Sequence, residues 1–193
     1  MKQKSRTEYS VMNTTVAFLA QTLAIFMGFF TRVVFTRTLS EGYVGINGLF
    51  TDILNILSLS ELGVGTAITY ALYAPIARRD IKKQQILMRM FRNFYRITAG
   101  FVVLAGLCLI PFLDILMKDR PDVNHLIIIY LLYLLNSVVS YLLIYKKTLV
   151  DAHQMNYITV MYHNGFLVLQ DILQIMVLFL TRNFILFLVI AVV

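Results

Sequence analysis

The chain has 193 residues, of which 59% are hydrophobic and only 14% are charged, and its mean hydropathy is +0.76. Soluble domains carry about 25% charged residues, so this composition excludes an ordinary water-soluble fold. The net charge is +7, and the single cysteine, Cys108, excludes a disulfide framework and argues against a metal site built on cysteine.

The apolar residues form long blocks that lack the alternation of β-strands, and such blocks predict membrane-spanning helices rather than a β-barrel. We expect helices over about 11–38, 44–72, 95–117, 124–145 and 157–180, with a further helix beginning near Phe184. A crossing takes about 20 apolar residues, so the last run, 184–193, is expected to continue beyond Val193. The expected fold is all-α: a polytopic helical membrane protein with about five and a half transmembrane helices.

Lysine and arginine residues in the connections predict the orientation of these helices, because cytoplasmic loops carry an excess of both. Most of them lie in the N-terminal tail and in the connections after the second and fourth helices, which share one side if the helices alternate. The opposite connections hold only Lys118, Arg120 and Arg182. The N-terminus is therefore predicted to be cytoplasmic, and the topology explains the basic excess without a nucleic-acid partner.

The longest polar stretch is a cytoplasmic basic loop at about 74–95, in which Ile81, Leu87 and Phe91 are interspersed with lysines and arginines. Two interpretations of its second part, 80–95, stay open. It is an amphipathic helix that lies on the anionic lipids of the inner leaflet, or it is a cytoplasmic extension of the third membrane helix.

Polar residues inside spans usually face a protein interior or a water-filled cavity. On the first helix, a polar stripe lies within about 40° of the direction of Arg32 and comprises Thr14, Gln21, Gly28 and Thr36. We predict that Gln21 and Arg32 line a cavity, with an internal ion pair as the alternative for Arg32. Arg37 points about 140° away from Arg32, so it either joins the cavity through a bend or extends to the outer interface.

The second helix has a similar seam. It lies within about 60° of the direction of Asn55, has Asp52 at its edge, and comprises Gly48, Thr51, Ser58, Thr66 and Thr69. Small and hydroxyl-bearing residues of this kind serve either helix packing or a cavity wall, and both interpretations stay open. Glu61 points about 120° away from Asn55, and we expect it to form a structural ion pair with Arg32 or Arg37.

Asp171 lies near the middle of the fifth helix and shares a face with Asn164. A carboxylate at this depth is a candidate site for proton or sodium coupling. The histidines, at positions 125, 153 and 163, lack the spacing of metal ligands and are expected to anchor span ends at the interface. We therefore predict neither a metal nor a cofactor.

One part of the sequence resembles a known family. The run 31–50, TRVVFTRTLSEGYVGINGLF, leads into 59–68, LSELGVGTAI, and then into 72–75, LYAP. An arginine-bearing helix end, a glycine-containing turn and a helix with a Ser-Glu-Leu-Gly-Val-Gly core are similar to the opening of bacterial polysaccharide flippases. These flippases belong to the superfamily of multidrug, oligosaccharidyl-lipid and polysaccharide exporters.

The resemblance implies that 1–193 is the incomplete N-terminal lobe, of six helices, in a protein with two such lobes around a central cavity. Members of the lipid-linked-sugar branch move undecaprenyl-diphosphate oligosaccharides across the bacterial cytoplasmic membrane by alternating access, without enzymatic chemistry. It also implies that Arg32, and secondly Arg37, meets the diphosphate, in a cavity that would include Gln21, Asp52 and Asn55. Polysaccharide polymerases and glycosyltransferases are the implied partners. An acid follows the first-helix arginine in the lipid II branch, whereas Val33 follows Arg32 here, which argues against lipid II as the substrate.

Two other functions are alternatives to a flippase. An ion-coupled multidrug or cation antiporter of the same fold would be expected to have a cavity rich in carboxylates, whereas an arginine dominates the first helix. A membrane polysaccharide polymerase or ligase would be expected to carry a large outer loop with acids or histidines. The outer connections expected here are only a few residues long.

Overall fold

The computed structural model describes residues 6–58, 63–117, 123 and 125–192, and its secondary structure over these residues is entirely helical. The helices are α1 (Arg6–Thr38), α2 (Glu41–Ser58), α3 (Val64–Ala77), α4 (Ile81–Leu109), α5 (Leu113–Leu116), α6 (Leu126–Ala152), α7 (Asn156–Thr181) and α8 (Phe184–Val192). A 3-10 turn, Ile110–Phe112, joins α4 to α5.

Within the described part of the chain, four segments are long and apolar enough to cross a membrane: Thr14–Thr38, Ile81–Phe112, Leu126–Ala152 and Asn156–Thr181. Large apolar side chains on them are exposed, including Phe18, Leu104 and Phe166. Such a surface suits contact with lipid tails and not with water. The protein is therefore an all-α, multi-pass helical membrane protein, as the sequence predicted.

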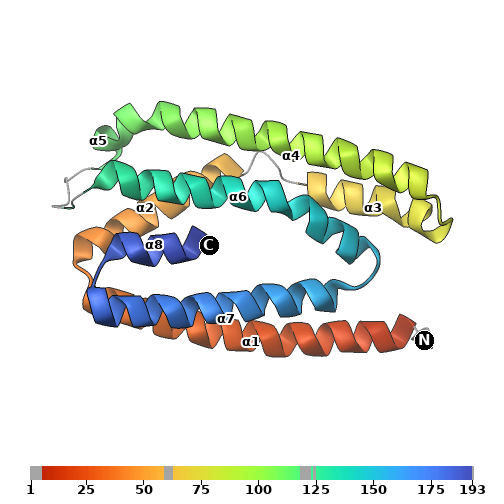
Figure 1. Cartoon of the computed structure of the whole chain (residues 1–193), viewed down its shortest axis with the longest axis horizontal. Coiled ribbons are helices and arrows are strands. Elements are labelled where there is room, and N and C mark those ends of the chain that lie inside the picture. Colours follow the sequence, from red (N-terminus) through yellow and green to blue (C-terminus); the bar gives the residue numbers. More distant parts are fainter. Residues whose placement is uncertain (1–5, 59–62, 118–122, 124, 193) are drawn as a thin grey trace.

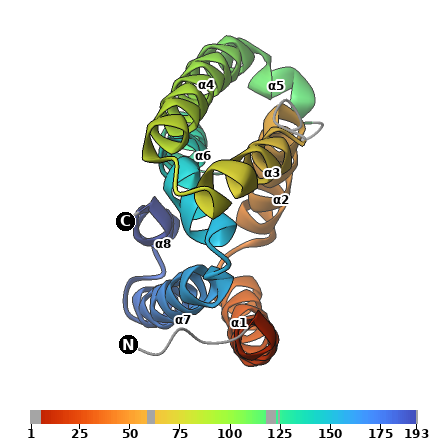
Figure 2. The ribbon, with the colours of Figure 1, turned by 90° about the vertical axis from the view of Figure 1, so that its right-hand side faces the viewer.

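The long helices lie side by side and alternate in direction along the chain (Figure 1). The first described turn of α1, the α3–α4 connection and the α6–α7 connection lie at one end, on the right of Figure 1, while the α1–α2 and α7–α8 connections lie at the other. α1 packs mainly against α7, and α6 packs against α3 and α4. α8 returns to contact both α6 and α7, and α1, α2 and α3 line one side of the assembly (Figure 2).

The prediction of one continuous helix over 44–72 was wrong. The structure has two helices there, and residues 59–62 between them lie outside the description. Gly63, directly before α3, has a φ of 87°, in the left-handed region that favours glycine and is incompatible with a continuing α-helix. Because the helix is interrupted here, helical periodicity across 44–72 does not place Thr66 and Thr69 on the face of Thr51 and Asn55.

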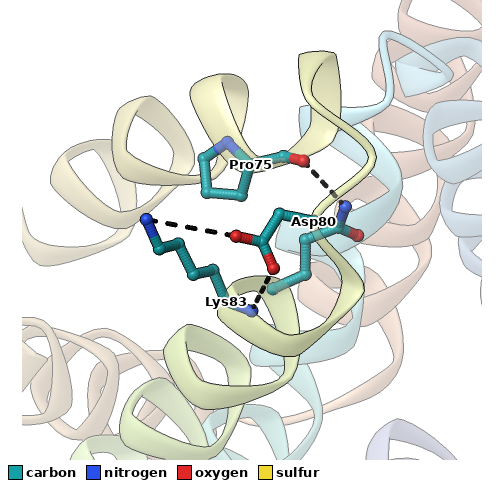
Figure 3. Close-up of polar contacts among 4 residues, drawn as sticks. Pro75, Asp80 and Lys83 are labelled. Carbon is teal, nitrogen blue, oxygen red and sulfur yellow. Dashed lines mark hydrogen bonds and ion pairs between the residues drawn. The ribbon is translucent and has the colours of Figure 1, made fainter.

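The basic segment 80–95 is an extension of the third membrane helix, since α4 runs without interruption from Ile81 to Leu109. The carboxylate of Asp80 caps α4 by accepting a hydrogen bond from the backbone nitrogen of Lys83 at 3.1 Å (Figure 3). The Pro75 carbonyl, near the end of α3, accepts from the backbone nitrogen of Asp80 at 2.9 Å. It also accepts from Nε2 of Gln84 at 3.2 Å. These bonds make the turn between α3 and α4 tight.

Two apolar clusters hold the helices together. One joins α1, α2, α6 and α8 through Phe35, Phe50, Tyr130 and Phe184, and the other joins α3, α4 and α6 around Phe91. The buried hydroxyl of Tyr130 donates to the carbonyl of Gly106 on α4 at 2.9 Å. A Cβ atom on Gly106 would lie 2.5 Å from a methyl carbon of Leu134, so a larger residue at this position would displace the Leu134 side chain where α4 approaches α6.

Candidate functional site

The polar stripe predicted on α1 is uncovered. Thr14, Gln21, Gly28, Arg32 and Thr36 are all exposed, whereas Thr31 and Phe35, which face the neighbouring helices, are buried. A Cβ atom added to Gly28 would meet nothing within 4 Å, so no described residue lies against α1 at this point of the stripe. Polar groups that face lipid are costly, and the stripe is therefore expected to face water or a polar partner.

A groove runs beside the first half of this stripe. It has a volume of about 760 Å³ and lies between α1, the first half of α7 and the end of α6. Its polar lining consists of Thr14, Gln21, Thr22, Lys147, Asn156, His163 and Asn164, and its apolar lining includes Phe18 and Ile25. Gln21 thus lines this groove together with Lys147, a cation supplied by another helix.

Sequence reasoning missed Lys147 and His163 as lining residues. From the sequence, Lys147 contributes only to the basic charge that predicts the orientation of the helices in the membrane, and His163 is expected to anchor a span end at the interface. A signal for the second did exist, because Asn156, Val160, His163 and Asn164 recur at the spacing of one helix face. No local pattern signals Lys147, because α6 brings it to α1 from far along the chain.

Arg32 lies where α1, α2 and α6 converge. Its guanidinium carbon is 5.5 Å from the centre of the Phe35 ring on the next turn of α1, within the range of a cation–π contact. It is also close enough to the Tyr133 hydroxyl on α6 for an electrostatic interaction. That hydroxyl donates in turn to the side-chain oxygen of Asn47 on α2.

Arg32 has no ion-pair partner among the residues that the structure describes. Glu61, the partner expected for it, lies outside them. Arg32 is therefore an exposed cation, held against an aromatic ring, whose guanidinium donors are available to an anion from outside this set of helices.

Arg37 occupies the last turn of α1 and is exposed. The helix is continuous through both arginines, so Arg37 does not share the face of Arg32, and the two do not form a clamp. A cation in the last turn interacts favourably with the helix dipole, which fits a position at the membrane interface.

Asp52 and Asn55 lie on an exposed face of α2. The neighbouring hydroxyl of Thr51 donates to the carbonyl of Asn47 within the same helix at 2.6 Å. Thr66 and Thr69 on α3 likewise donate to backbone carbonyls of Gly63 and Gly65. These three hydroxyls donate within their own segments of chain, and these bonds do not link helices.

Asp171 connects α7 to α1. Its carboxylate is half-buried and accepts a hydrogen bond from the hydroxyl of buried Thr31 at 2.9 Å. One turn further along α7, Nε2 of buried Gln174 donates to the carbonyl of Phe187 on α8 at 3.1 Å. Both polar side chains fasten α7 to its neighbours, and Asp171 lies behind the exposed stripe, on the side where α1 meets α7.

No protein-family model, curated protein or solved structure matches this chain. Over the described residues, histidine, cysteine, aspartate and glutamate side chains form no group of three that could hold a metal ion. The candidate functional site is therefore the exposed polar face of α1, which carries Arg32, together with the adjoining groove.

Proposed function

We propose that this chain forms part of a flippase that carries a lipid-linked oligosaccharide across the bacterial cytoplasmic membrane, with the N-terminus in the cytoplasm. The observation that carries the proposal is the uncovered stripe of α1. Lys147 and Gln21 lie in the groove beside one half of the stripe, and Arg32 lies on the other half.

The spacing of these groups suits a travelling diphosphate. Gln21 and Arg32 are 11 positions apart in a continuous helix, which corresponds to roughly 16 Å along the axis, about half the thickness of the hydrocarbon core. A diphosphate in hydrocarbon needs charge-assisted hydrogen bonds, and guanidinium supplies them in a bidentate geometry. Lys147 would attract the diphosphate on the cytoplasmic side, and Arg32 would receive it deeper in the membrane.

The lining of the groove agrees with an amphiphilic substrate. Gln21, Lys147 and His163 offer polar contacts to a head group, while Phe18 and Ile25 offer apolar contacts to a prenyl chain. The prenyl tail remains in lipid while the head group follows the stripe, so no bond is formed or broken. A second lobe opposite α1 and α2 would close the cavity and allow alternating access. Polysaccharide polymerases and glycosyltransferases are the partners that such transport would serve.

The experiment is an export assay with the full-length protein in its native host. Arg32→Ala is expected to abolish the appearance of surface polysaccharide at an unchanged protein level. Arg32→Lys is expected to retain part of the export, because lysine keeps the positive charge but lacks the bidentate hydrogen-bond donors of the guanidinium group. Arg78→Ala, which removes an exposed arginine in the α3–α4 connection, is the matched control and should export normally. Normal export by Arg32→Ala at full expression would refute the assigned role.

Asp171 favours a second candidate, an ion-coupled exporter of the same architecture that moves cations or drugs. A half-buried carboxylate whose described partner is a hydroxyl can bind a proton or sodium ion. Under this alternative, Asp171→Asn abolishes ethidium efflux from a sensitised host and Arg32→Ala leaves efflux intact. The flippase proposal predicts no ethidium efflux by either the variant or the parent.

A further inference from the structure

A second cationic site lies on the other side of the molecule, between α4 and α6. It is a small pocket of about 170 Å³ lined by Arg92, Tyr95, Arg96, Tyr141, Leu142 and Tyr145. The arginines come from successive turns of α4, and Tyr141 and Tyr145 from successive turns of α6. Tyr141 is buried and its ring stacks against that of Tyr95, which gives the pocket a firm wall.

The Nε atom of Arg92 is buried and has no hydrogen-bond partner among the described residues. Buried donors are rarely left without a partner, and a charged one is especially costly. No carboxylate lines the pocket to satisfy it. α4 contains no acidic residue, and the one acid of α6, Asp151, accepts from the hydroxyl of Thr159 at 2.7 Å. The site therefore has the charge and the free donor for an anion that comes from outside this part of the chain.

The position along α4 identifies the surroundings of the pocket. α4 has 29 residues, or roughly 43 Å, and is longer than the about 30 Å of a hydrocarbon core. Its basic residues all lie at or before Arg96, and apolar residues dominate from Ile97 onward. The pocket thus lies at the boundary between the spanning part of α4 and its polar extension, where lipid phosphates are found.

The remaining basic residues of α4 lead to the same place. Lys82, Arg89 and Arg96 lie within about 40° of one another around the helix, and all three are exposed. This basic row would attract an anionic membrane surface in general, without binding one particular lipid phosphate. Only Arg92 and Arg96 combine with tyrosines in a hollow, so the row and the pocket make separable contributions.

The size of the pocket limits its ligand. Pockets for drug-sized molecules have volumes of about 300–1,000 Å³, and the present one is smaller. At roughly 30 Å³ per water, it has room for a phosphate group and not for an oligosaccharide. Two guanidinium groups and the hydroxyl of Tyr145 are donors that match phosphate oxygens.

We propose that this pocket binds the phosphate of an anionic membrane lipid, with Arg92 and Arg96 as its ligands. The acyl chains of such a lipid would lie along the exposed apolar side chains that follow on α4 and α6, among them Ile97, Leu104 and Leu135. The bound lipid would fix the depth of α4 in the bilayer. The proposal does not depend on what the α1 stripe transports.

The test is lipid binding to the full chain in a neutral detergent, measured by native mass spectrometry. The probes are phosphatidylglycerol, diacylglycerol without phosphate, and inorganic phosphate. Phosphatidylglycerol is expected to bind, and diacylglycerol is not. Arg92→Gln with Arg96→Gln is expected to weaken phosphatidylglycerol binding by tenfold or more, because the variant removes the charge-assisted hydrogen bonds to the phosphate; tenfold corresponds to about 1.4 kcal/mol.

The matched control is Lys82→Gln with Arg89→Gln, which removes the same charge from the exposed row and should change the affinity less than threefold or so. Equal losses of phosphatidylglycerol affinity in the two double variants would contradict a specific site in the pocket and would indicate non-specific attraction by surface charge. If inorganic phosphate binds as tightly as phosphatidylglycerol, the proposal that the bound phosphate belongs to a lipid would be contradicted. Tyr145→Phe keeps the packing and removes one hydroxyl, so a several-fold weaker affinity in this variant supports the pocket even if the arginine variants fold poorly.

Discussion

The two long helix pairs of this protein, α4 with α6 and α1 with α7, are built in different ways. In the most apolar part of α4, 28% of the residues are buried within the protein, against 11% in α1. α4 and α6 meet through a glycine, stacked tyrosines and a buried hydroxyl. α1 meets α7 through a polar link between Thr31 and Asp171, while Gln21, Arg32 and Thr36 on α1 remain exposed.

This difference separates scaffold from working surface. The α4–α6 contact uses side chains whose shapes fit closely, so changes there should alter stability. The exposed stripe of α1 contributes little to packing, so changes there should alter what the protein does and not whether it folds. The following variants test this division, in order of the expected effect on stability.

Gly106→Ala should destabilise the protein most. The added methyl group would lie 2.5 Å from a side-chain carbon of Leu134, which is itself buried, and overpacking of this kind costs about 1–3 kcal/mol. Thermal unfolding in detergent micelles measures the loss. Gly100→Ala on the same helix is the control, because its Cβ meets nothing within 4 Å, and it should leave stability unchanged or raise it by up to about 1 kcal/mol. Equal behaviour of the two variants would contradict the close approach of α4 to α6.

Thr31→Val should have an intermediate effect, because it removes the hydroxyl that donates to Asp171 while nearly keeping the volume. Hydrogen bonds between membrane helices average about 0.6 kcal/mol and reach about 1.7 kcal/mol. The control is Thr22→Val, whose hydroxyl donates to the Phe18 carbonyl of its own helix. A Thr31→Val variant that unfolds like the parent, in the same micelle assay, would show that this link does not hold α1 to α7.

Gln21→Ala should have the smallest effect on unfolding, within about 0.5 kcal/mol, because the side chain is exposed in the groove. The flippase proposal nevertheless predicts reduced export of polysaccharide by this variant. Unfolding and export are measured on the same preparation and strain. A stable Gln21→Ala variant with full export would show that Gln21 in the groove is not needed for transport.

The sequence was sufficient to predict the long helices. α1, α4, α6 and α7 each contain an apolar block that is long enough to identify by itself, and their predicted and observed bounds differ mainly where polar turns extend them. The break before α3 was not predicted, because small and hydroxyl residues on both sides of Gly63 continue a helical pattern. Gly63, directly before α3, has a φ of 87°, and such a backbone angle cannot be read from periodicity.

The site was predictable only where one helix carries it. The stripe of Gln21 and Arg32 follows from helix geometry alone, and both residues are exposed in the structure. Contacts between distant segments could not be predicted in this way. Thr31 and Asp171 are 140 positions apart, and Lys147 reaches the groove from α6. Their proximity depends on how the helices pack, which a single sequence does not specify.

The central claim is that the α1 stripe faces water inside the membrane, and thiol accessibility tests it most directly. In a Cys108→Ser background, Gln21→Cys and Gly28→Cys place thiols on the stripe, while Leu23→Cys and Phe30→Cys place them on a face about 160–180° away from Arg32 that is equally exposed in the structure. The account predicts that a membrane-impermeant, hydrophilic maleimide labels the first pair in native membranes and spares the second. Equal protection of all four thiols would mean that the stripe faces lipid or a dry contact, and would contradict the account.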